Sequence, residues 1–343
     1  MASQAEIAAM RRALDAAREP TERISPNPRV GCVLLDPVGN VLAVGRHRGP
    51  GTAHAETDAL AQAGVAADDA TAVVTLEPCH HAGRTGPCTA ALVAAGVARV
   101  VYAVDDPNPA AAGGAAVLRA AGVDVEGGVL TAAAYALNER WLIAVGRSRP
   151  YVTWKYAATL DGRSAAADGT SAWITSPAAR RDANCRRAEA DAVVVGTGTV
   201  LTDDPRLTVR DAADAPLPYD RQPTRVVVGT RDIPDSARVW DDAAPTIQIR
   251  THDVHAVVTA LHDLELRHVW LEGGPRLAGA FVAAGVVDEV VGYLAPALLG
   301  AGPTAVEQAG VATIDDIHRL LIRDVERVGP DLRIVARPAQ EER

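Results

Sequence analysis

The first 145 residues alternate between segments whose hydrophobic pattern predicts strands and segments whose pattern predicts helices. Residues 29–35 and 41–45 are apolar runs on either side of a turn that contains Pro and Gly, which predicts a β-hairpin. Residues 54–63 have the pattern of a helix, and Gly64 is a suitable residue to end it. A strand, a helix and another strand are predicted at residues 72–76, 88–95 and 99–104. This repeated order predicts a largely parallel sheet covered by helices.

A second α/β series begins after residues 145–150, which we interpret as the boundary between two domains. Strand-forming runs follow at residues 151–157, 192–195, 224–228, 268–271 and 289–294. Residues 211–223 are rich in Ala, Pro and Asp and predict a surface loop. A chain of 343 residues is also long for one core. We therefore expect two domains, at residues 1–146 and 150–343.

Composition argues against several classes of partner. The formal net charge is −9, so a broad basic surface for nucleic acid is not expected. No apolar run approaches the roughly 18–20 residues that span a bilayer, and the N-terminus has no signal-peptide pattern. The 4 cysteines are too few for a disulfide framework, and metal or catalytic use is the commoner alternative. We expect a cytoplasmic protein without nucleic-acid or membrane partners.

Lys155 is the only lysine among the 34 basic residues of the chain. Arginine has replaced lysine wherever the chemistry tolerates it, so a retained lysine predicts a role that a permanently charged guanidinium cannot fill. Chance retention is the alternative.

The first half contains a candidate zinc site made of His54, Cys79 and Cys88, with Glu56 beside it. A catalytic zinc needs three protein ligands and an open position, and one imidazole with two thiolates supplies that set. Glu56 follows the histidine by two residues and would move protons rather than bind metal, as in zinc nucleobase deaminases. The cysteines are separated by eight residues, whereas such deaminases most often place two between them.

Other interpretations of these residues stay open. The two cysteines could be structural, or His80 or His81 could complete a closed structural zinc site. Cys32 and Cys185 have no such neighbours, and we expect each to be a small buried hydrophobic residue.

In the second half, a predicted strand ends at Glu272 and is followed by Gly273, Gly274 and Pro275. Proline suits the first position of a helix, and the free N–H groups of a helix start can bind a pyrophosphate. A plain tight turn is the alternative. The chain has neither the Gly-x-Gly-x-x-Gly fingerprint after a strand nor a Walker A loop.

Residues 78–88 resemble the long cysteine loop of the bifunctional deaminase/reductase family of riboflavin biosynthesis, and residues 26–32, His47 and 106–109 match its other deaminase motifs. The resemblance implies a cytidine-deaminase-like three-layer domain followed by a dihydrofolate-reductase-like α/β domain. It implies a phosphoribosylated diaminopyrimidinone substrate, surrounded by Asn27, His47, Arg84, Asp106 and Asn108. The two asparagines also suit turns beside proline, and Asp106 could simply cap one.

Residues 155–162, 169–176, 196–210 and 271–281 resemble the reductase domain of the same family, whose coenzyme is NADPH. The resemblance assigns these residues to the coenzyme: Ala158, Trp173, Thr199, Asp203, Gly274, Pro275, Arg276, Leu277, Ala278, Gly279 and Ala280. It assigns these to the substrate: Ser171, Arg187, Leu207, Arg210 and Glu272. Trp173 could instead belong to the core, and the two arginines could be solvated surface residues.

The resulting prediction is a bifunctional enzyme that uses one zinc ion per chain and NADPH. Its first domain hydrolyses the 2-amino group of the phosphorylated pyrimidine, with Glu56 as the proton carrier, and its second domain reduces the ribosyl chain to ribityl. We expect Lys155 and Glu272 either to relay a proton in the reduction or only to bind substrate, and we expect a homo-oligomer, a dimer or a tetramer. The alternatives are a deaminase of free cytosine or guanine compounds, a nucleic-acid-editing deaminase and a non-catalytic zinc module.

Overall fold

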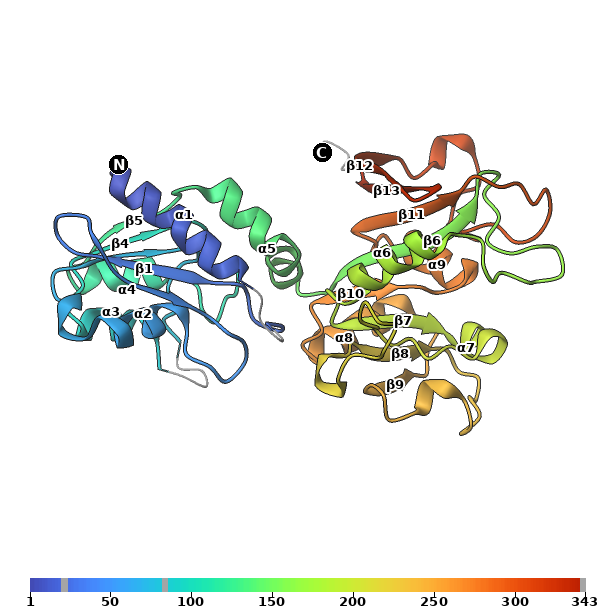
Figure 1. The fold of residues 1–343 in the computed structure, drawn as a ribbon, viewed down its shortest axis with the longest axis horizontal. Helices are drawn as coiled ribbons and strands as arrows, with labels where there is room; N and C mark the ends of the chain where they lie inside the picture. The colour runs from blue at the N-terminus through green and yellow to red at the C-terminus, as the bar shows by residue number, and fades with distance from the viewer. Residues whose placement is uncertain (20–23, 82–85, 340–343) are drawn as a thin grey trace. The chain divides into compact units, whose positions relative to one another are not determined.

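The computed structural model describes residues 1–19, 24–81 and 86–339. The chain forms two compact units, Met1–Ser148 and Arg149–Arg343, and each has its own sheet (Figure 1). Among the described residues, no helix has both the length and the apolar character needed to cross a membrane.

The first unit is built on a five-stranded sheet with the strand order β2-β1-β3-β4-β5. The strands are β1 (Gly31–Leu35), β2 (Val41–Arg46), β3 (Thr71–Val74), β4 (Arg99–Tyr102) and β5 (Asp124–Glu126). β1 is antiparallel to both of its neighbours, whereas β3, β4 and β5 are parallel to one another. Four of the five strands therefore run in one direction, as the prediction of a largely parallel sheet requires, and β1 alone runs against them, so that its two pairings are antiparallel.

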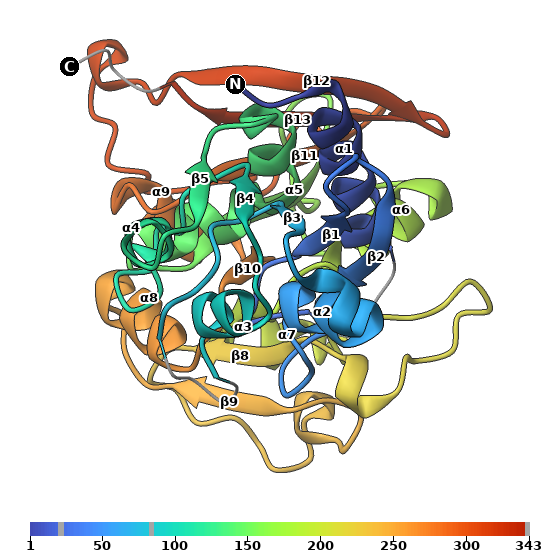
Figure 2. The same cartoon turned by 90° about the vertical axis from the view of Figure 1, so that its left-hand side faces the viewer.

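Helices cover both faces of this sheet (Figure 2). The helices on one face are α2 (Ala55–Ala63), α3 (Cys88–Ala94) and α4 (Gly114–Ala120), with the 3-10 helix η1 (Gly64–Ala67) after α2. Those on the other face are α1 (Gln4–Arg18) and α5 (Thr131–Gly146). Every residue of β1 is buried, because successive side chains enter the two cores in turn. The predicted three-layer arrangement is confirmed.

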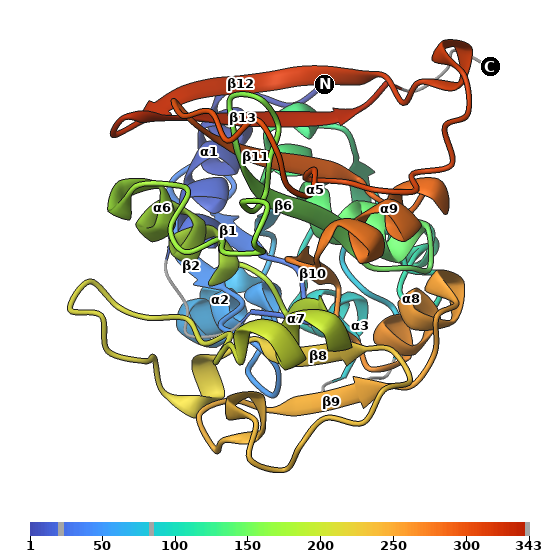
Figure 3. The same ribbon diagram turned by 90° about the vertical axis from the view of Figure 1, so that its right-hand side faces the viewer.

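The second unit contains an eight-stranded sheet with the order β12-β13-β11-β6-β10-β7-β8-β9, so that β12 and β9 form its two edges (Figure 3). The strands are β6 (Tyr151–Thr159), β7 (Ala192–Gly196), β8 (Thr224–Val228), β9 (Thr246–Ile249), β10 (His268–Leu271), β11 (Glu289–Ala295), β12 (Leu320–Val328) and β13 (Asp331–Pro338). The six strands from β11 to β9 are parallel, and β13 and β12 extend the sheet as an antiparallel pair.

Two hydrophobic clusters occupy the two faces of this sheet. The elements outside the sheet are α6 (Pro177–Arg187), α7 (Thr197–Asp203), α8 (Val254–Asp263), α9 (Pro275–Ala283), η2 (Tyr219–Arg221), η3 (Arg238–Trp240) and η4 (Ile314–Asp316). Residues of α8 and α9 pack on one face, and residues of α6 and α7 pack on the other. The predicted α/β class of this half is confirmed.

Two sequence-based expectations differ from the structure. Cys32 is buried in the core as expected, but Cys185 is exposed, because it lies on the outer side of α6, away from Ala179 and Ala183. The strand predicted at residues 151–157 is longer in the structure, because β11 pairs with β6 as far as Thr159.

Candidate active sites

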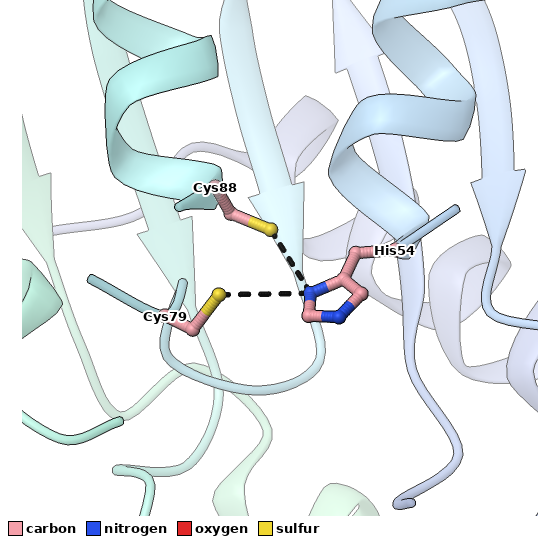
Figure 4. A group of neighbouring side chains, drawn as sticks. All are labelled: His54, Cys79 and Cys88. Atoms are coloured by element: carbon pink, nitrogen blue, oxygen red, sulfur yellow. Dashed lines mark hydrogen bonds between the residues drawn. The ribbon is translucent and has the colours of Figure 1, made fainter. Parts of the chain in front are cut away.

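Three side chains from separate elements meet in the first unit (Figure 4). His54 is the N-cap of α2, Cys79 lies in the loop after β3, and Cys88 is the first residue of α3. The Nδ1 atom of His54 lies 3.2 Å from Sγ of Cys88 and 3.6 Å from Sγ of Cys79. All three candidate ligand atoms lie within 4.8 Å of one another.

This spacing fits a tetrahedral zinc ion. Zinc bonds of roughly 2.3 Å to sulfur and 2.0–2.1 Å to nitrogen place neighbouring ligand atoms about 3.5–3.8 Å apart. A thiolate pair balances the charge of the ion, and three protein ligands leave one coordination position for water or substrate. The residues therefore fit a catalytic zinc site.

The backbone around His54 is held by a close contact between β2 and α2. A Cβ atom added to Gly45 would lie 2.1 Å from the carbonyl oxygen of Ala55, so only glycine permits this approach. His54 itself has the extended backbone angles of an N-cap, and its side chain does not cap the helix that follows, which leaves the imidazole for the metal site.

A fourth protein ligand is not present among the residues that the structure describes. The Nδ1 atom of His80 lies 3.0 Å from the carbonyl oxygen of Ala111 and is engaged there. The described group that can hold a metal contains His54, Cys79 and Cys88, without His80 or His81. The geometry thus favours the open site over a closed structural one.

Glu56 lies on the first turn of α2, two residues beyond His54, and its side chain is buried. Burial raises the pKa of its carboxyl to about 7, and the charge of Cys79 adds to this effect. Hydrogen bonds from Cys88 and His54 hold the pKa of the Cys79 thiol well below its usual value, which favours the thiolate that a metal needs.

Asn27 and His47 adjoin the metal ligands. The Asn27 amide nitrogen lies 2.8 Å from Nε2 of His47, and Nδ1 of that ring lies 3.0 Å from the carbonyl oxygen of Ala53. Nδ1 therefore carries the proton and Nε2 accepts, and burial lowers the pKa of His47, which favours this neutral form. The His47 ring packs edge-on against the His54 ring at 5.4 Å between centroids.

Asp106 and Asn108 form a turn after β4. The Asp106 carboxylate accepts the backbone N–H of Asn108 at 2.9 Å, and the Asn108 side chain accepts that of Ala110 at 3.1 Å. Asp106 does cap a turn, and it is also buried, which raises its pKa to about 6. Arg84, the other predicted substrate residue of this half, lies outside the described residues.

His81 received no substrate role from the sequence, where it was considered only as a metal ligand. Its Nδ1 atom is buried and has no hydrogen-bond partner within the described part of the chain. A buried polar nitrogen left unpaired is uncommon and indicates a group that a ligand completes. From the sequence, only the position of His81 two residues after Cys79 could have suggested that it contacts a ligand.

In the second unit, Lys155 and Glu272 are brought together by the register of two parallel strands. Leu271, the last residue of β10, pairs with Trp154 of β6. The residues that follow these two, Glu272 and Lys155, therefore lie next to each other. The Lys155 ammonium has no hydrogen bond or ion pair among the described residues, and burial lowers its pKa.

Glu272 is engaged by Arg187 rather than by Lys155. Nε and Nη2 of Arg187 donate to the two carboxylate oxygens at 2.7 and 2.8 Å, and the Trp270 indole N–H donates to one of them. Arg187 and Lys155 together lower the pKa of Glu272 to about 2, despite its burial. Arg187 is therefore not a solvated surface residue.

Two strand-to-helix turns lie side by side at the carboxyl ends of β7 and β10. Gly274 is the N-cap of α9 and Pro275 its first residue, as predicted. A Cβ on Gly274 would lie 3.8 Å from Oγ1 of Thr199, which belongs to the turn of α7 after β7. The start of α9 thus faces the start of α7 across a short distance.

The other residues expected at the coenzyme differ in their exposure. Trp173 is 75% exposed with the Arg180 guanidinium 4.5 Å above its ring, so the alternative that it belongs to the core is wrong. Ala158 is buried and Asp203 is exposed. Within α9, Arg276 is exposed, Leu277 and Ala280 are half-buried, Ala278 is buried, and Gly279 packs against the backbone of Glu307.

The remaining residues expected at the substrate lie around α6 and the loop after α7. Ser171 is exposed, and Leu207 is buried with a φ of 53°. Arg210 donates to the carbonyl oxygen of Asp214 at 2.7 Å, so its guanidinium is engaged by the loop that follows it.

Comparisons with known proteins cover both units. Residues 150–334 match the family model of the RibD C-terminal domain, and residues 3–104 match that of the cytidine and deoxycytidylate deaminase zinc-binding region. The chain is 53% identical over 309 residues to the riboflavin biosynthesis protein RibD of Mycobacterium tuberculosis, with 90% of each chain covered. It is 39% identical to the Escherichia coli protein of the same name, over 94% of this chain and 96% of that one.

Solved structures give the same result. RibD of Acinetobacter baumannii is similar with a TM-score of 0.89 at 35% identity, covering 98% of this chain and 99% of that one. A diaminohydroxyphosphoribosylaminopyrimidine deaminase/5-amino-6-(5-phosphoribosylamino)uracil reductase of Thermotoga maritima is similar with a TM-score of 0.83 at 30% identity, covering 98% and 99%.

We expect Cys88→Ala to lower the zinc content of the purified protein from about one ion per chain to a small fraction of that, because two protein ligands bind zinc far more weakly than three. Elemental analysis of purified protein measures this. Cys185→Ala is the matched control, since it removes an exposed thiol outside the group and should keep its zinc. Full zinc content in the Cys88 variant would refute the ligand set.

Proposed function

The chain belongs to the RibD family of bifunctional riboflavin biosynthesis enzymes, zinc-dependent deaminases and NADPH-dependent reductases, and from that premise we propose which residues carry out its two reactions. Residues 1–146 hydrolyse the 2-amino group of 2,5-diamino-6-ribosylamino-4(3H)-pyrimidinone 5′-phosphate. Residues 150–343 then reduce the ribosyl side chain of the product to ribityl. The observation that carries this proposal is the three-ligand group with an open position beside a buried Glu56.

In the deaminase, His54, Cys79 and Cys88 hold the zinc ion. Zinc, when bound, supplies the Lewis acidity that makes water nucleophilic near neutral pH. Glu56 takes a proton from that water and delivers it to the departing amine nitrogen, which a carboxyl group buried beside the site can do.

Polar side chains around the metal orient the pyrimidinone. Asn27 has one N–H on His47 and keeps its amide oxygen and second N–H for the ring of the substrate. Asp106 and Asn108 present polar groups from the turn after β4, and the unpaired nitrogen of His81 adds another. Arg84, which follows Cys79 by five residues in the sequence, supplies a cation for the phosphate.

In the reductase, Lys155 delivers a proton to the opening sugar or to the pyrimidine amine as hydride reaches C1′, and Glu272 holds Arg187 and Trp270 in place. NADPH, when bound, supplies a hydride to C1′ of the ribosyl group. A carboxylate with a pKa near 2 and two bonds from Arg187 is a poor proton carrier, whereas a buried ammonium without a partner among the described residues is a good donor. Ser171, Leu207 and Arg210 complete the part of the reductase site that binds the substrate.

The coenzyme lies along the paired turns after β7 and β10. The N–H groups at the start of α9, at Gly274 and Arg276, provide an anion site for the pyrophosphate, with Pro275, which has no N–H, setting the first helical turn, and Thr199 faces the site from the neighbouring turn. Leu277, Ala278, Gly279 and Ala280 support that start of the helix. Ala158, Trp173 and Asp203 line the rest of the coenzyme site. The exposed indole of Trp173 is available to stack on a ring of the coenzyme.

The enzyme forms a homo-oligomer through the edge strand β12. Leu320, Leu321, Ile322 and Val325 are all at least 43% exposed, although they belong to a strand with apolar residues on both sides. An unpaired apolar edge is a site for association, and a two-fold axis lets two copies of one edge cover each other. This gives a dimer, or a tetramer if two dimers associate.

The enzyme works in the cytoplasm. Its metal centre needs two reduced thiols, which a reducing compartment maintains, and the structure places Cys79 and Cys88 without a disulfide. Fractionation of cells with an antibody against the protein tests this, and recovery outside the cytoplasm would refute it.

Glu56→Gln is expected to lower the rate of deamination by at least the ~10²–10⁴-fold typical of a positioned acid/base, with zinc retained. Ammonia release and elemental analysis measure the two effects. Reduction of separately supplied deaminated substrate should be unchanged. Asp58→Asn is the matched control, since Asp58 lies on the same helical turn but binds Arg48. Near-normal ammonia release by Glu56→Gln would rule out the mechanism.

Lys155→Arg is expected to lower the kcat of reduction by two orders of magnitude or more, while the Kd for NADPH is preserved, because a guanidinium does not give up its proton. In the wild-type enzyme, kcat should fall as the pH rises through the lowered pKa of Lys155, since the protonated amine is the active form. A wild-type kcat in the variant, with only KM raised, would indicate that Lys155 merely binds substrate.

Ile322→Glu is expected to convert the oligomer to monomers, because it places a carboxylate in the apolar edge. Sedimentation velocity of the full chain measures this. Leu264→Glu is the matched control, as Leu264 is 55% exposed on the same unit but lies after α8, away from β12. An oligomer that is insensitive to Ile322→Glu, or a wild-type monomer, would contradict the assignment.

A further inference from the structure

Glu77 is a buried carboxylate that the reaction described above does not use. It lies between β3 and the metal ligand Cys79, and it is 7% exposed. No cation pairs with it in the part of the chain that the structure describes. Burying an unpaired carboxylate is costly, so its contacts must compensate for the lost hydration.

Both oxygens of Glu77 accept backbone N–H groups. Oε2 accepts the N–H of Asp106 at 3.2 Å, and Oε1 accepts the N–H of Ala115 at 2.9 Å. The first donor belongs to the turn after β4, and the second belongs to the first turn of α4. A carboxylate offers two acceptor oxygens, whereas the isosteric glutamine offers one oxygen and an NH₂ group that would oppose a donor. The arrangement therefore requires glutamate.

Further contacts join the same two stretches of chain. The backbone N–H of Glu77 donates to the carbonyl oxygen of Val104 at 2.9 Å, and His80 bonds to Ala111. The carbonyl oxygen of Pro78 fits against Gly114, where an added Cβ would lie 1.8 Å away. Residues 77–80, which include Cys79, are thus fastened to residues 104–115, which include Asp106.

We propose that Glu77 is a positioning residue for the deamination, which fixes the backbone of Asp106 relative to the metal ligand Cys79 and so holds the Asp106 side chain against the substrate. The inference rests on the proposed substrate role of Asp106. Glu77 touches neither substrate nor metal and acts through the Asp106 turn. Its negative charge adds to burial in raising the pKa of Asp106, which agrees with the closeness of the two carboxyl groups.

The test compares Glu77→Gln, Asp106→Asn and the double variant in the full-length zinc-loaded protein. Glu77→Gln is expected to raise the KM for deamination roughly 10-fold, the size expected when a buried N–H loses its acceptor, with kcat within about 3-fold of wild type. Zinc content and the reduction of deaminated substrate should not change. In the Asp106→Asn background, Glu77→Gln should add nothing to KM, because both changes act on the same contact.

Asp105→Asn is the matched control. Asp105 adjoins Asp106 in the same loop, but its carboxylate accepts the Tyr102 hydroxyl at 2.8 Å and does not bond to Glu77. Its KM should remain that of the wild type. If Glu77→Gln does not fold, as judged by circular dichroism and thermal unfolding of the full chain, Glu77→Asp keeps both oxygens with a shorter reach and is compared in the same two backgrounds, with a smaller rise in KM expected.

The outcomes separate the inference from the role it rests on. An unchanged KM in Asp106→Asn would refute the proposed substrate role of Asp106, and the inference with it. A raised KM in Asp106→Asn but not in the Glu77 variants would overturn the inference alone. Additive effects of the two changes, or a loss of zinc in Glu77→Gln, would also overturn it, since they indicate a general structural role.

Discussion

The meeting of His54, Cys79 and Cys88 is the constraint on which the first unit depends. Each ligand lies at an element boundary: the residue before α2, the loop after β3 and the first residue of α3. The imidazole nitrogen of His54 lies within hydrogen-bonding distance of both sulfurs, at 3.2 and 3.6 Å, and the surrounding backbone holds the three side chains there. The approach of β2 to α2 and the contacts of the Cys79 loop with α4 supply that support.

Buried carboxyl groups in the two units have opposite electrostatic surroundings. In the first unit, Glu56 and Asp106 are buried, and no arginine of the described residues lies against them, so their pKa values are raised to about 7 and about 6. In the second unit, Arg187 and Lys155 lower the pKa of Glu272 to about 2. A group that must exchange a proton near neutrality suits the first setting, and a fixed negative charge suits the second. The two units thus use the same side-chain type for different tasks.

The second unit follows the rule that ligands gather at the carboxyl ends of parallel strands. β7 and β10 are neighbours in the sheet, and the turns after them place Thr199 beside Gly274. On the other side of β10, β6 continues beyond the point where β10 ends, so Lys155 lies next to Glu272 at this end of the sheet. One short strand between two longer ones therefore brings the turns after β7 and β10 and the Lys155 side of β6 to the same end of the sheet.

The sequence alone determined the two α/β domains, most central strands, the zinc ligand types and the family, because hydrophobic periodicity and short motifs are local properties. It did not predict β5, β9, β12 and β13. β5 has three residues, and β12 is exposed on both sides, so neither has the pattern of a buried strand. The exposure of Cys185, the mixed direction of the first sheet and the pairing of Arg187 with Glu272 depend on contacts between residues far apart in the chain. Only the tertiary structure decides those contacts, since strand register and packing set them and no local pattern records them.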